Sequence, residues 1–185
     1  NALGIHIVGD LPIYVAYDSS DVWAHPEQFE LGEDLLPVEV SGVPPDYFSE
    51  DGQLWGNPLY NWDYMAVDGF SWWNSRICAS FELFDIMRLD HFRGFVDYWA
   101  VPFGSPTARK GRWRPGPGIA LLDSIREACP QASLIAEDLG SFQDSAVDDL
   151  RELAGYPGMR ILQFAFDYRA DNVHLPHNYK ANSVV

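Results

Sequence analysis

The sequence predicts an α/β fold built around a parallel sheet. Four short apolar runs are typical of buried strands, and they lie at residues 4–10, 84–90, 133–140 and 159–166. Segments with helical spacing accompany the later runs. The order strand, helix, strand, helix, strand is typical of parallel strands joined by crossover helices.

Three segments carry the helical pattern. In the first, 68–84, apolar residues recur three or four positions apart, at Phe70, Trp73, Ile77, Phe81 and Phe84. The second, 118–129, repeats the pattern and is stopped by Pro130. The third spans 141–155, with Ser141 as the expected N-cap.

Two long connections interrupt this rhythm, at about 11–67 and 95–117, and both are rich in Pro, Gly and aromatic residues. Connections of this length inside one domain are usually functional, or else they indicate that the assignment of helices and strands is wrong. Each follows the carboxyl end of a predicted strand, which is where βα architectures assemble their active sites.

Composition narrows the class of protein. A chain of 185 residues with 47% hydrophobic residues can form one domain with a sizeable core. The net charge of −15 argues against nucleic acid as a partner, because phosphates require a basic surface. No apolar run approaches the roughly 18 residues of a membrane span. Two cysteines do not form a disulfide framework, so we expect a reducing, cytoplasmic location.

The first candidate for chemistry is the pair Arg88 and Asp90 in "DIMRLDHFRG". Two residues apart on a strand, their side chains point to the same side, where Arg88 would keep Asp90 ionised. An ionised carboxylate at the carboxyl end of a strand suits a nucleophile. The alternative is a buried structural ion pair.

The second candidate is Glu137 in "LIAEDLG", directly after an apolar run. Partial desolvation there raises the pKa of a carboxyl group and suits a general acid. The alternative is that Glu137 or Asp138 caps the next helix. Two carboxylates at neighbouring strand ends, one ionised and one protonated, share the work in retaining glycosidases.

Other residues give weaker signals. Asp10 is a third acidic strand end, although Asp before Pro12 is also typical of a turn. The "HLPH" segment at 174–177 predicts no metal site, since the proline disrupts helical spacing and no further ligand is evident. The chain has seven Trp, nine Tyr and eleven Phe. We expect most of these rings in the core, and the others could line a groove for a flat, hydroxylated ligand such as a sugar ring.

Several long blocks carry a resemblance to a known family: "GDLPIYVAYDSSDVWAHPE", "GVPPDYFSEDGQLWGNPLYNW", "RLDHFRGF", "IAEDLG" and "GYPGMRILQFAF". Together they resemble the amylomaltases, which are 4-α-glucanotransferases of the disproportionating-enzyme type in glycoside hydrolase family 77. The similarity covers essentially all 185 residues.

The resemblance implies a partial (β/α)8 TIM barrel of the α-amylase clan, about half of it present, with residues 1–185 as a fragment of one catalytic domain. By motif match, Asp90 would be the nucleophile, Glu137 the general acid/base and Arg88 the residue that orients Asp90. The resemblance also implies substrate contacts, at His91, Asp10, Tyr14, Tyr47, Phe48 and Trp55. Of these, Tyr47, Phe48 and Trp55 would form an aromatic loop over the acceptor side.

The implied function is transfer of α-1,4-glucan segments between glucans or maltooligosaccharides by a retaining double displacement, with no metal or organic cofactor. The family also carries a third catalytic aspartate in a His-Asp motif, which would follow the "LPHNY" segment just beyond Val185. We therefore expect the 185 residues alone to be an inactive fragment. The alternatives are an α-glucan hydrolase of the same clan and a non-catalytic glucan-binding protein. Oligomeric state is not predicted.

Overall fold

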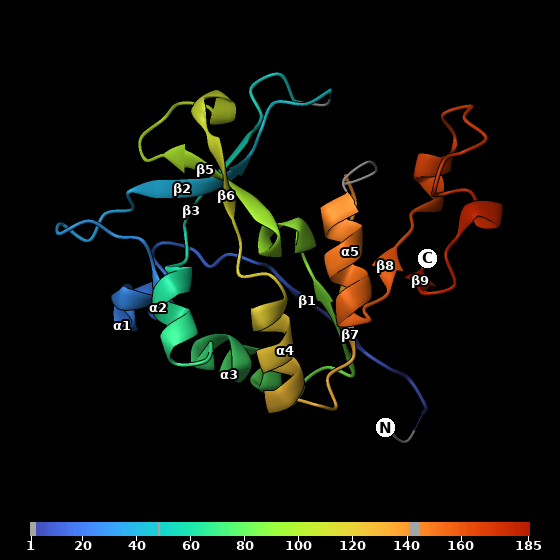
Figure 1. Cartoon of the computed structure of the whole chain (residues 1–185), viewed down its shortest axis with the longest axis horizontal. Helices are drawn as coiled ribbons and strands as arrows, with labels where there is room; N and C mark the ends of the chain where they lie inside the picture. The colour runs from blue at the N-terminus through green and yellow to red at the C-terminus, as the bar shows by residue number, and fades with distance from the viewer. Residues whose placement is uncertain (1–2, 48, 141–144) are drawn as a thin grey trace.

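The computed structural model describes residues 3–47, 49–140 and 145–185, and these residues form two sheets (Figure 1). The larger sheet has five strands in the order β1-β4-β7-β8-β9, and every neighbouring pair is parallel. Its strands are β1 (Val8–Leu11), β4 (Ile86–Leu89), β7 (Leu134–Ala136), β8 (Gly158–Met159) and β9 (Ser183–Val184). The predicted α/β fold with a parallel sheet is confirmed.

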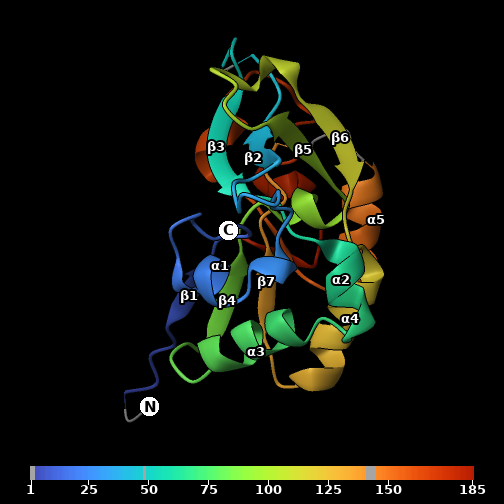
Figure 2. The same ribbon diagram turned by 90° about the vertical axis from the view of Figure 1, so that its left-hand side faces the viewer.

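The smaller sheet is antiparallel, with the order β3-β2-β5-β6. Its strands are β2 (Glu39–Val43), β3 (Gln53–Pro58), β5 (Asp97–Pro102) and β6 (Arg112–Pro115). All four lie in the two long connections, at 11–67 and 95–117, where the sequence predicts no strand. Figure 2 shows this sheet at one end of the molecule and α3 at the other.

Local sequence did not reveal the smaller sheet because its strands depend on distant partners. The Glu39 carboxylate of β2 pairs with Arg112 and Arg114 of β6 across 3.0 Å each, more than 70 residues along the chain. Gly42 is required where β2 approaches β3, since a Cβ there would lie 2.5 Å from the Gln53 carbonyl oxygen. Neither feature can be recognised in a short segment of the sequence.

The helices are α1 (Ser20–Ala24), α2 (Trp62–Val67), α3 (Ser71–Ser80), α4 (Ile119–Ala128) and α5 (Ser145–Ala154). Short 3-10 helices lie at Pro26–Gln28, Phe92–Phe95, Ala108–Lys110, Leu162–Ala165 and Pro176–Asn178. The three predicted helices correspond to α3, α4 and α5, and the expected cap Ser141 lies outside the described residues. The first is shorter than predicted, because Phe70 adopts a left-handed conformation (φ 57°) and the Asp68 carboxylate caps Ser71.

The predicted strand at 159–166 is largely wrong. Only Met159 of that run lies in β8, and residues Leu162–Ala165 form a 3-10 helix. The chain turns because the Ile161 amide donates to His174 Nδ1 instead of to a neighbouring strand. The predicted strand at 4–10 is also shorter, since β1 starts at Val8.

Alternation along the parallel strands separates the core from the site. Leu11, Met87 and Leu89 point into the core, with the buried side chains of α3 and α4. Asp10 and Arg88 point to the opposite face, because successive side chains in a strand alternate. The register pairs Asp10 with Arg88, so these two side chains stand next to each other.

An aromatic cluster anchors the 11–67 connection to α3. Trp73 is fully buried, and its ring packs edge-on against Trp72 and Phe95 with centroids 5.6 and 5.4 Å away. The Tyr60 hydroxyl donates to the Ile13 carbonyl across 2.7 Å. The cluster therefore fixes the segment that leaves β1.

Both cysteines are free, and they lie near each other on α3 and at the end of α4. Burial, together with the neighbouring Cys78 thiol, raises the pKa of Cys129 to about 11. The Cys129 thiol is therefore protonated and inert at neutral pH. Among the described helices, none has the length and apolar character needed to cross a membrane.

We predict that Trp73→Ala lowers the free energy of unfolding by about 3–5 kcal/mol, because it empties the centre of the aromatic cluster. Urea unfolding followed by far-UV circular dichroism measures the change. Trp23→Ala is the matched control: Trp23 is 86% exposed, so its loss should change stability by less than about 0.5 kcal/mol. Equal effects of the two substitutions would contradict this assignment of the core.

Candidate active site

Three acidic strand ends meet around the guanidinium of Arg88. Arg88 Nη1 lies 2.6 Å from Asp10 Oδ1, and Nη2 lies 2.7 Å from Asp90 Oδ1. The same Nη2 is 4.0 Å from Glu137 Oε2. The structure thus brings together the residues that the sequence analysis placed at the ends of the first three predicted strands.

The strand register explains this convergence. Asp10 of β1 stands opposite Arg88 of β4. Beyond the last paired residues, the Asp90 amide donates to the Leu11 carbonyl and the Glu137 amide donates to the Leu89 carbonyl, each across 3.0 Å. Both carboxylates are therefore fixed at the carboxyl edge of the sheet by backbone hydrogen bonds.

Arg88 remains a cation in this setting. Burial lowers the pKa of Arg88, but the hydrogen bond to Asp10 and the charges of Asp90 and Glu137 outweigh it and raise the pKa overall. A permanent positive charge 2.7 Å from Asp90 stabilises the ionised carboxylate. The pairing that the sequence predicted between Arg88 and Asp90 is present.

Glu137 has a different environment from Asp90. Its side chain is only 11% exposed, compared with 39% for Asp90. Burial raises the pKa of Glu137, although the Leu139 and His91 amides, which donate to its two oxygens, oppose that change. The predicted rise is confirmed. Within the described residues, the hydrogen bonds that the Glu137 carboxylate accepts come from these two amides.

Asp138 has a structural role. Its side chain is 4% exposed and pairs with Arg151 of α5 at 3.2 Å and with Arg160 at 3.4 Å. It also accepts a hydrogen bond from the Met159 amide across 2.8 Å. Asp138 therefore ties β7 to α5 and to β8. The sequence analysis did not predict this network. The feature that could have revealed it is Arg151, a charged residue on the apolar face of an amphipathic helix.

Met159 is a second residue that sequence reasoning missed. Its sulfur accepts a hydrogen bond from Arg88 Nε across 3.3 Å. All three nitrogens of the guanidinium are thus engaged: Nε by the thioether, Nη1 by Asp10 and Nη2 by Asp90. Because the guanidinium is planar, these contacts fix its orientation.

Aromatic side chains border the carboxylates. The Trp55 indole of β3 packs edge-on against His91 with ring centroids 4.8 Å apart. Tyr14 lies 6.3 Å from Trp55 and stacks on Tyr60, so it is 8% exposed and belongs largely to the core. Tyr47, between β2 and β3, is 97% exposed. Phe48 lies outside the described residues.

His91 is a neutral imidazole in this site. Burial lowers its pKa to about 4, an effect that Asp90 opposes and Arg93 reinforces. His91 sits at the turn after β4 in a left-handed conformation (φ 52°), which lets its amide reach Glu137 while its ring faces Trp55.

The arrangement supports nucleophilic and acid/base chemistry on a neutral substrate. Three carboxyl groups face one arginine, so an anionic ligand would be repelled, whereas a transition state that develops positive charge would be stabilised. Among the described residues, no group of three or more His, Cys, Asp or Glu side chains could hold a metal ion.

Comparison with known proteins gives consistent matches over the chain. The family model described as 4-alpha-glucanotransferase (glycoside hydrolase family 77) matches residues 1–185. A 4-alpha-glucanotransferase of Thermus thermophilus is 53% identical over 184 residues, covering 100% of this chain and 37% of the relative. A chloroplastic/amyloplastic 4-alpha-glucanotransferase of Solanum tuberosum is 54% identical, covering 98% of this chain and 31% of the relative.

A solved structure agrees with these matches. An amylomaltase from Streptococcus agalactiae, in complex with acarbose, superimposes with a TM-score of 0.93 at 46% identity, covering 99% of this chain and 37% of that protein. The chain thus spans 31% to 37% of the length of these three relatives.

We predict that the His91 ring titrates with a midpoint of about 4. A ¹H–¹⁵N NMR titration of the imidazole measures the midpoint, and His91→Asn, which tolerates the left-handed backbone, assigns the signal. Because the folded pKa is lowered, His91 stabilises the fold above the unfolded value of about 6.5 and loses that contribution as the pH falls towards 4. His91→Asn should therefore reduce acid sensitivity in this interval. A midpoint near 6.5 would contradict the burial of the ring.

We also predict that Met159→Leu leaves the fold intact and releases Arg88 Nε–H. Leucine keeps the volume, so the free energy of unfolding should fall by less than about 1.5 kcal/mol. Without the sulfur acceptor, the Arg88 Nε–H signal should exchange faster with water in ¹H–¹⁵N spectra. Met65→Leu, in the core, is the matched control and should leave this signal unchanged.

Proposed function

Because the chain belongs to the 4-α-glucanotransferase family, glycoside hydrolase family 77, we propose that it supplies the nucleophile and the general acid/base for transfer of α-1,4-glucan segments. The observation that carries this proposal is the pair Asp90 and Glu137 beside one arginine, with Glu137 largely buried, which raises its pKa. In retaining glycosidases, one carboxylate likewise acts as the nucleophile and the other as the general acid/base.

The first half of the reaction forms a covalent intermediate. Asp90 Oδ1 is bound by Arg88, and its other oxygen accepts no hydrogen bond from the described residues, so we assign the attack on the anomeric carbon to that oxygen. The bond to the leaving sugar oxygen breaks as Glu137 gives that oxygen a proton. The products are a glucosyl ester on Asp90 and a shortened glucan.

The second half reverses these roles. The Glu137 carboxylate takes the proton of an acceptor 4-hydroxyl, and that oxygen displaces Asp90 from the anomeric carbon, which restores the original configuration. The backbone amides of His91 and Leu139 occupy one lone pair on each Glu137 oxygen, so the transferred proton uses a remaining one.

The distances keep the two carboxyl groups close together, as a retaining mechanism requires. Asp90 Oδ1 and Glu137 Oε2 lie 2.7 and 4.0 Å from the same Arg88 nitrogen, so their separation cannot exceed the two distances added together. That limit lies at the lower edge of the ~6.5–9.5 Å range of inverting enzymes, which leave room for a water.

Transfer in preference to hydrolysis requires a sugar to exclude water from the intermediate. Trp55, held edge-on by His91, offers a partly exposed ring beside the carboxylates, and we assign it and Tyr47 to the acceptor side. A neutral His91 beside Asp90 suits hydrogen bonding to a donor sugar. Asp10 would reach the same sugar, and Tyr14 would mainly support Trp55.

We further infer that the parallel sheet is part of a (β/α)8 barrel, since its strands follow one another in chain order without a reversal. The resemblance implies a third catalytic aspartate in the family, so on this proposal Asp90 and Glu137 act together with a further carboxylate. For the location, we retain the inference of a reducing compartment such as the cytoplasm, although the Solanum tuberosum relative is named as chloroplastic/amyloplastic.

We predict that the protein expressed from its complete coding sequence converts maltotriose into glucose and longer oligosaccharides with little gain in reducing ends. Chromatography of the products and a reducing-end assay measure the two quantities. A steady rise in reducing ends would instead favour a hydrolase, and unchanged maltotriose would favour a binding protein.

Asp90→Asn should lower the transfer rate by roughly 10⁴-fold or more, and Glu137→Gln by about 10²–10⁴-fold. Asp123→Asn is the matched control, because Asp123 is an exposed carboxylate paired with Arg126 on α4, away from the site. Full activity in Asp90→Asn would exclude Asp90 as the nucleophile.

A further inference from the structure

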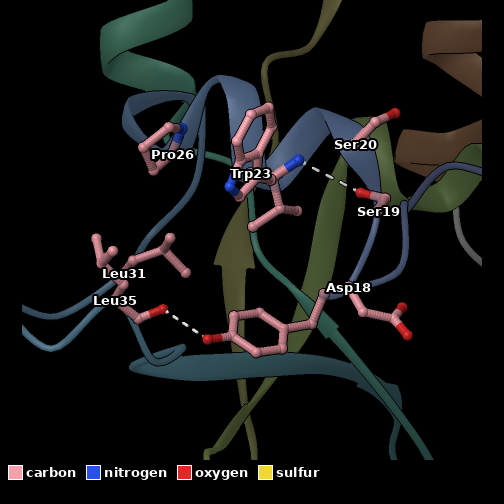
Figure 3. A pocket seen from close by; sticks show the side chains of 9 residues that line it. Asp18, Ser19, Ser20, Trp23, Pro26, Leu31 and Leu35 are labelled. Atoms are coloured by element: carbon pink, nitrogen blue, oxygen red, sulfur yellow. Dashed lines mark hydrogen bonds between the residues drawn. The ribbon is translucent and has the colours of Figure 1, made fainter.

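A pocket of about 450 Å³ lies outside the carboxylate cluster (Figure 3). It is formed by the chain from Tyr17 to Pro26, including α1, and by two leucines of the following loop, Leu31 and Leu35. Figure 3 shows Trp23 and Pro26 on one side, Leu31 and Leu35 on a second, and Asp18, Ser19 and Ser20 on a third. None of the residues around Arg88 lines it.

The two aromatic side chains of this pocket are exposed enough to contact a ligand. Trp23 is 86% exposed, and no hydrogen bond of its indole is found within the described residues. Tyr17 is 40% exposed, but its hydroxyl donates to the Leu35 carbonyl across 3.0 Å, which fixes the ring against the leucine loop. A large exposed aromatic ring beside a fixed one offers a ready stacking surface.

The polar groups of the pocket select the charge of a ligand. The Asp18 carboxylate and the Ser20 hydroxyl have no partner in the described part of the chain, and both residues are among those that line the pocket. No lysine or arginine lines the pocket, and the chain carries a net charge of −15. An anionic ligand is therefore disfavoured, whereas a neutral ligand rich in hydroxyl groups could donate to Asp18.

A sugar ring combines these properties, because it has apolar C–H faces and hydroxyl groups at its edge. A volume of about 450 Å³ lies within the ~300–1,000 Å³ of small-molecule sites. Exposed Trp and Tyr provide the stacking surface, the leucines the apolar wall, and Asp18 and Ser20 the hydrogen-bonding edge.

The pocket is also within reach of the carboxylate cluster. Asp10 in β1 and Tyr17 in the connection that follows are seven residues apart, so their Cα atoms are separated by at most about 25 Å. One oligosaccharide of several sugar units can cover such a distance. A short one, such as maltotriose, occupies only the carboxylate site.

We propose that the Tyr17–Trp23 pocket is a second binding site for α-1,4-glucan, which holds a remote part of a long chain whose reacting end lies at Asp90 and Glu137. The glucan identity of the ligand rests on the proposed function. The site favours long glucans over short ones, because only long chains occupy both places.

The first test compares substrates of two lengths in the protein expressed from its complete coding sequence. Trp23→Ala should raise KM for maltoheptaose roughly five- to tenfold, the loss of one stacking contact, and leave kcat and all constants for maltotriose unchanged. Tyr168→Ala is the control, since Tyr168 is fully exposed and does not line the pocket. Equal changes for the two substrates, or no change, would overturn the proposal.

The second test observes binding directly. In the Asp90→Asn protein, where turnover is blocked, maltoheptaose should shift the Trp23 indole N–H signal in a saturable way, and maltotriose should not. If transfer occurs but the Trp23 signal does not respond, the pocket fails and the proposed function stands. If the signal responds but no transfer occurs in the unmodified protein, the pocket stands as a glucan site and the catalytic proposal fails.

Discussion

The rest of the site depends on one ion, the guanidinium of Arg88. It points away from the apolar core because side chains alternate along β4, and the parallel register places Asp10 beside it. Asp90, two residues further on, shares its face, and Glu137 approaches from β7. A shift of one residue in the β1–β4 register would carry Asp10 to the core face and leave a charge unpaired there. The same register that buries Leu11, Met87 and Leu89 therefore assembles the acidic cluster.

Environment distinguishes the two central carboxyl groups more than their identity does. Asp90 is partly exposed and receives a full charge-assisted hydrogen bond from Arg88, whereas Glu137 is buried 4.0 Å from the same nitrogen. Desolvation is therefore the largest influence on the pKa of Glu137 and raises it. His91 links the two, since its backbone amide binds Glu137 and its neutral ring lies beside Asp90 and Trp55.

The smaller sheet brings the aromatic side chains to the cluster. It is built from chain that leaves β1 and β4 at their carboxyl ends, so its strands fold over the edge where the carboxylates lie (Figure 2). The ion pairs of Arg114 with Glu30 and Glu39 connect β6 to the 11–67 connection. That connection carries Tyr14, Trp55 and the Tyr17–Trp23 pocket, so one segment supports both the carboxylate site and the surface proposed for a remote part of the glucan.

The sequence by itself determined the α/β class, the approximate places of three helices and the acidic strand ends at Asp10, Asp90 and Glu137. These are local properties, since apolar periodicity and a charge after an apolar run can be read within about ten residues. The tertiary structure decided what depends on distant partners. The small antiparallel sheet includes ion pairs between residues more than 70 positions apart in the sequence. The run at 159–166 stops being a strand near Ile161, because the Ile161 amide donates its hydrogen bond to His174 Nδ1. Likewise, the roles of Met159 and Asp138 depend on the position of β8 beside β7, one strand away from β4. Their hydrogen-bond partners are close in space but distant in the sequence, so spacing along the chain does not reveal them.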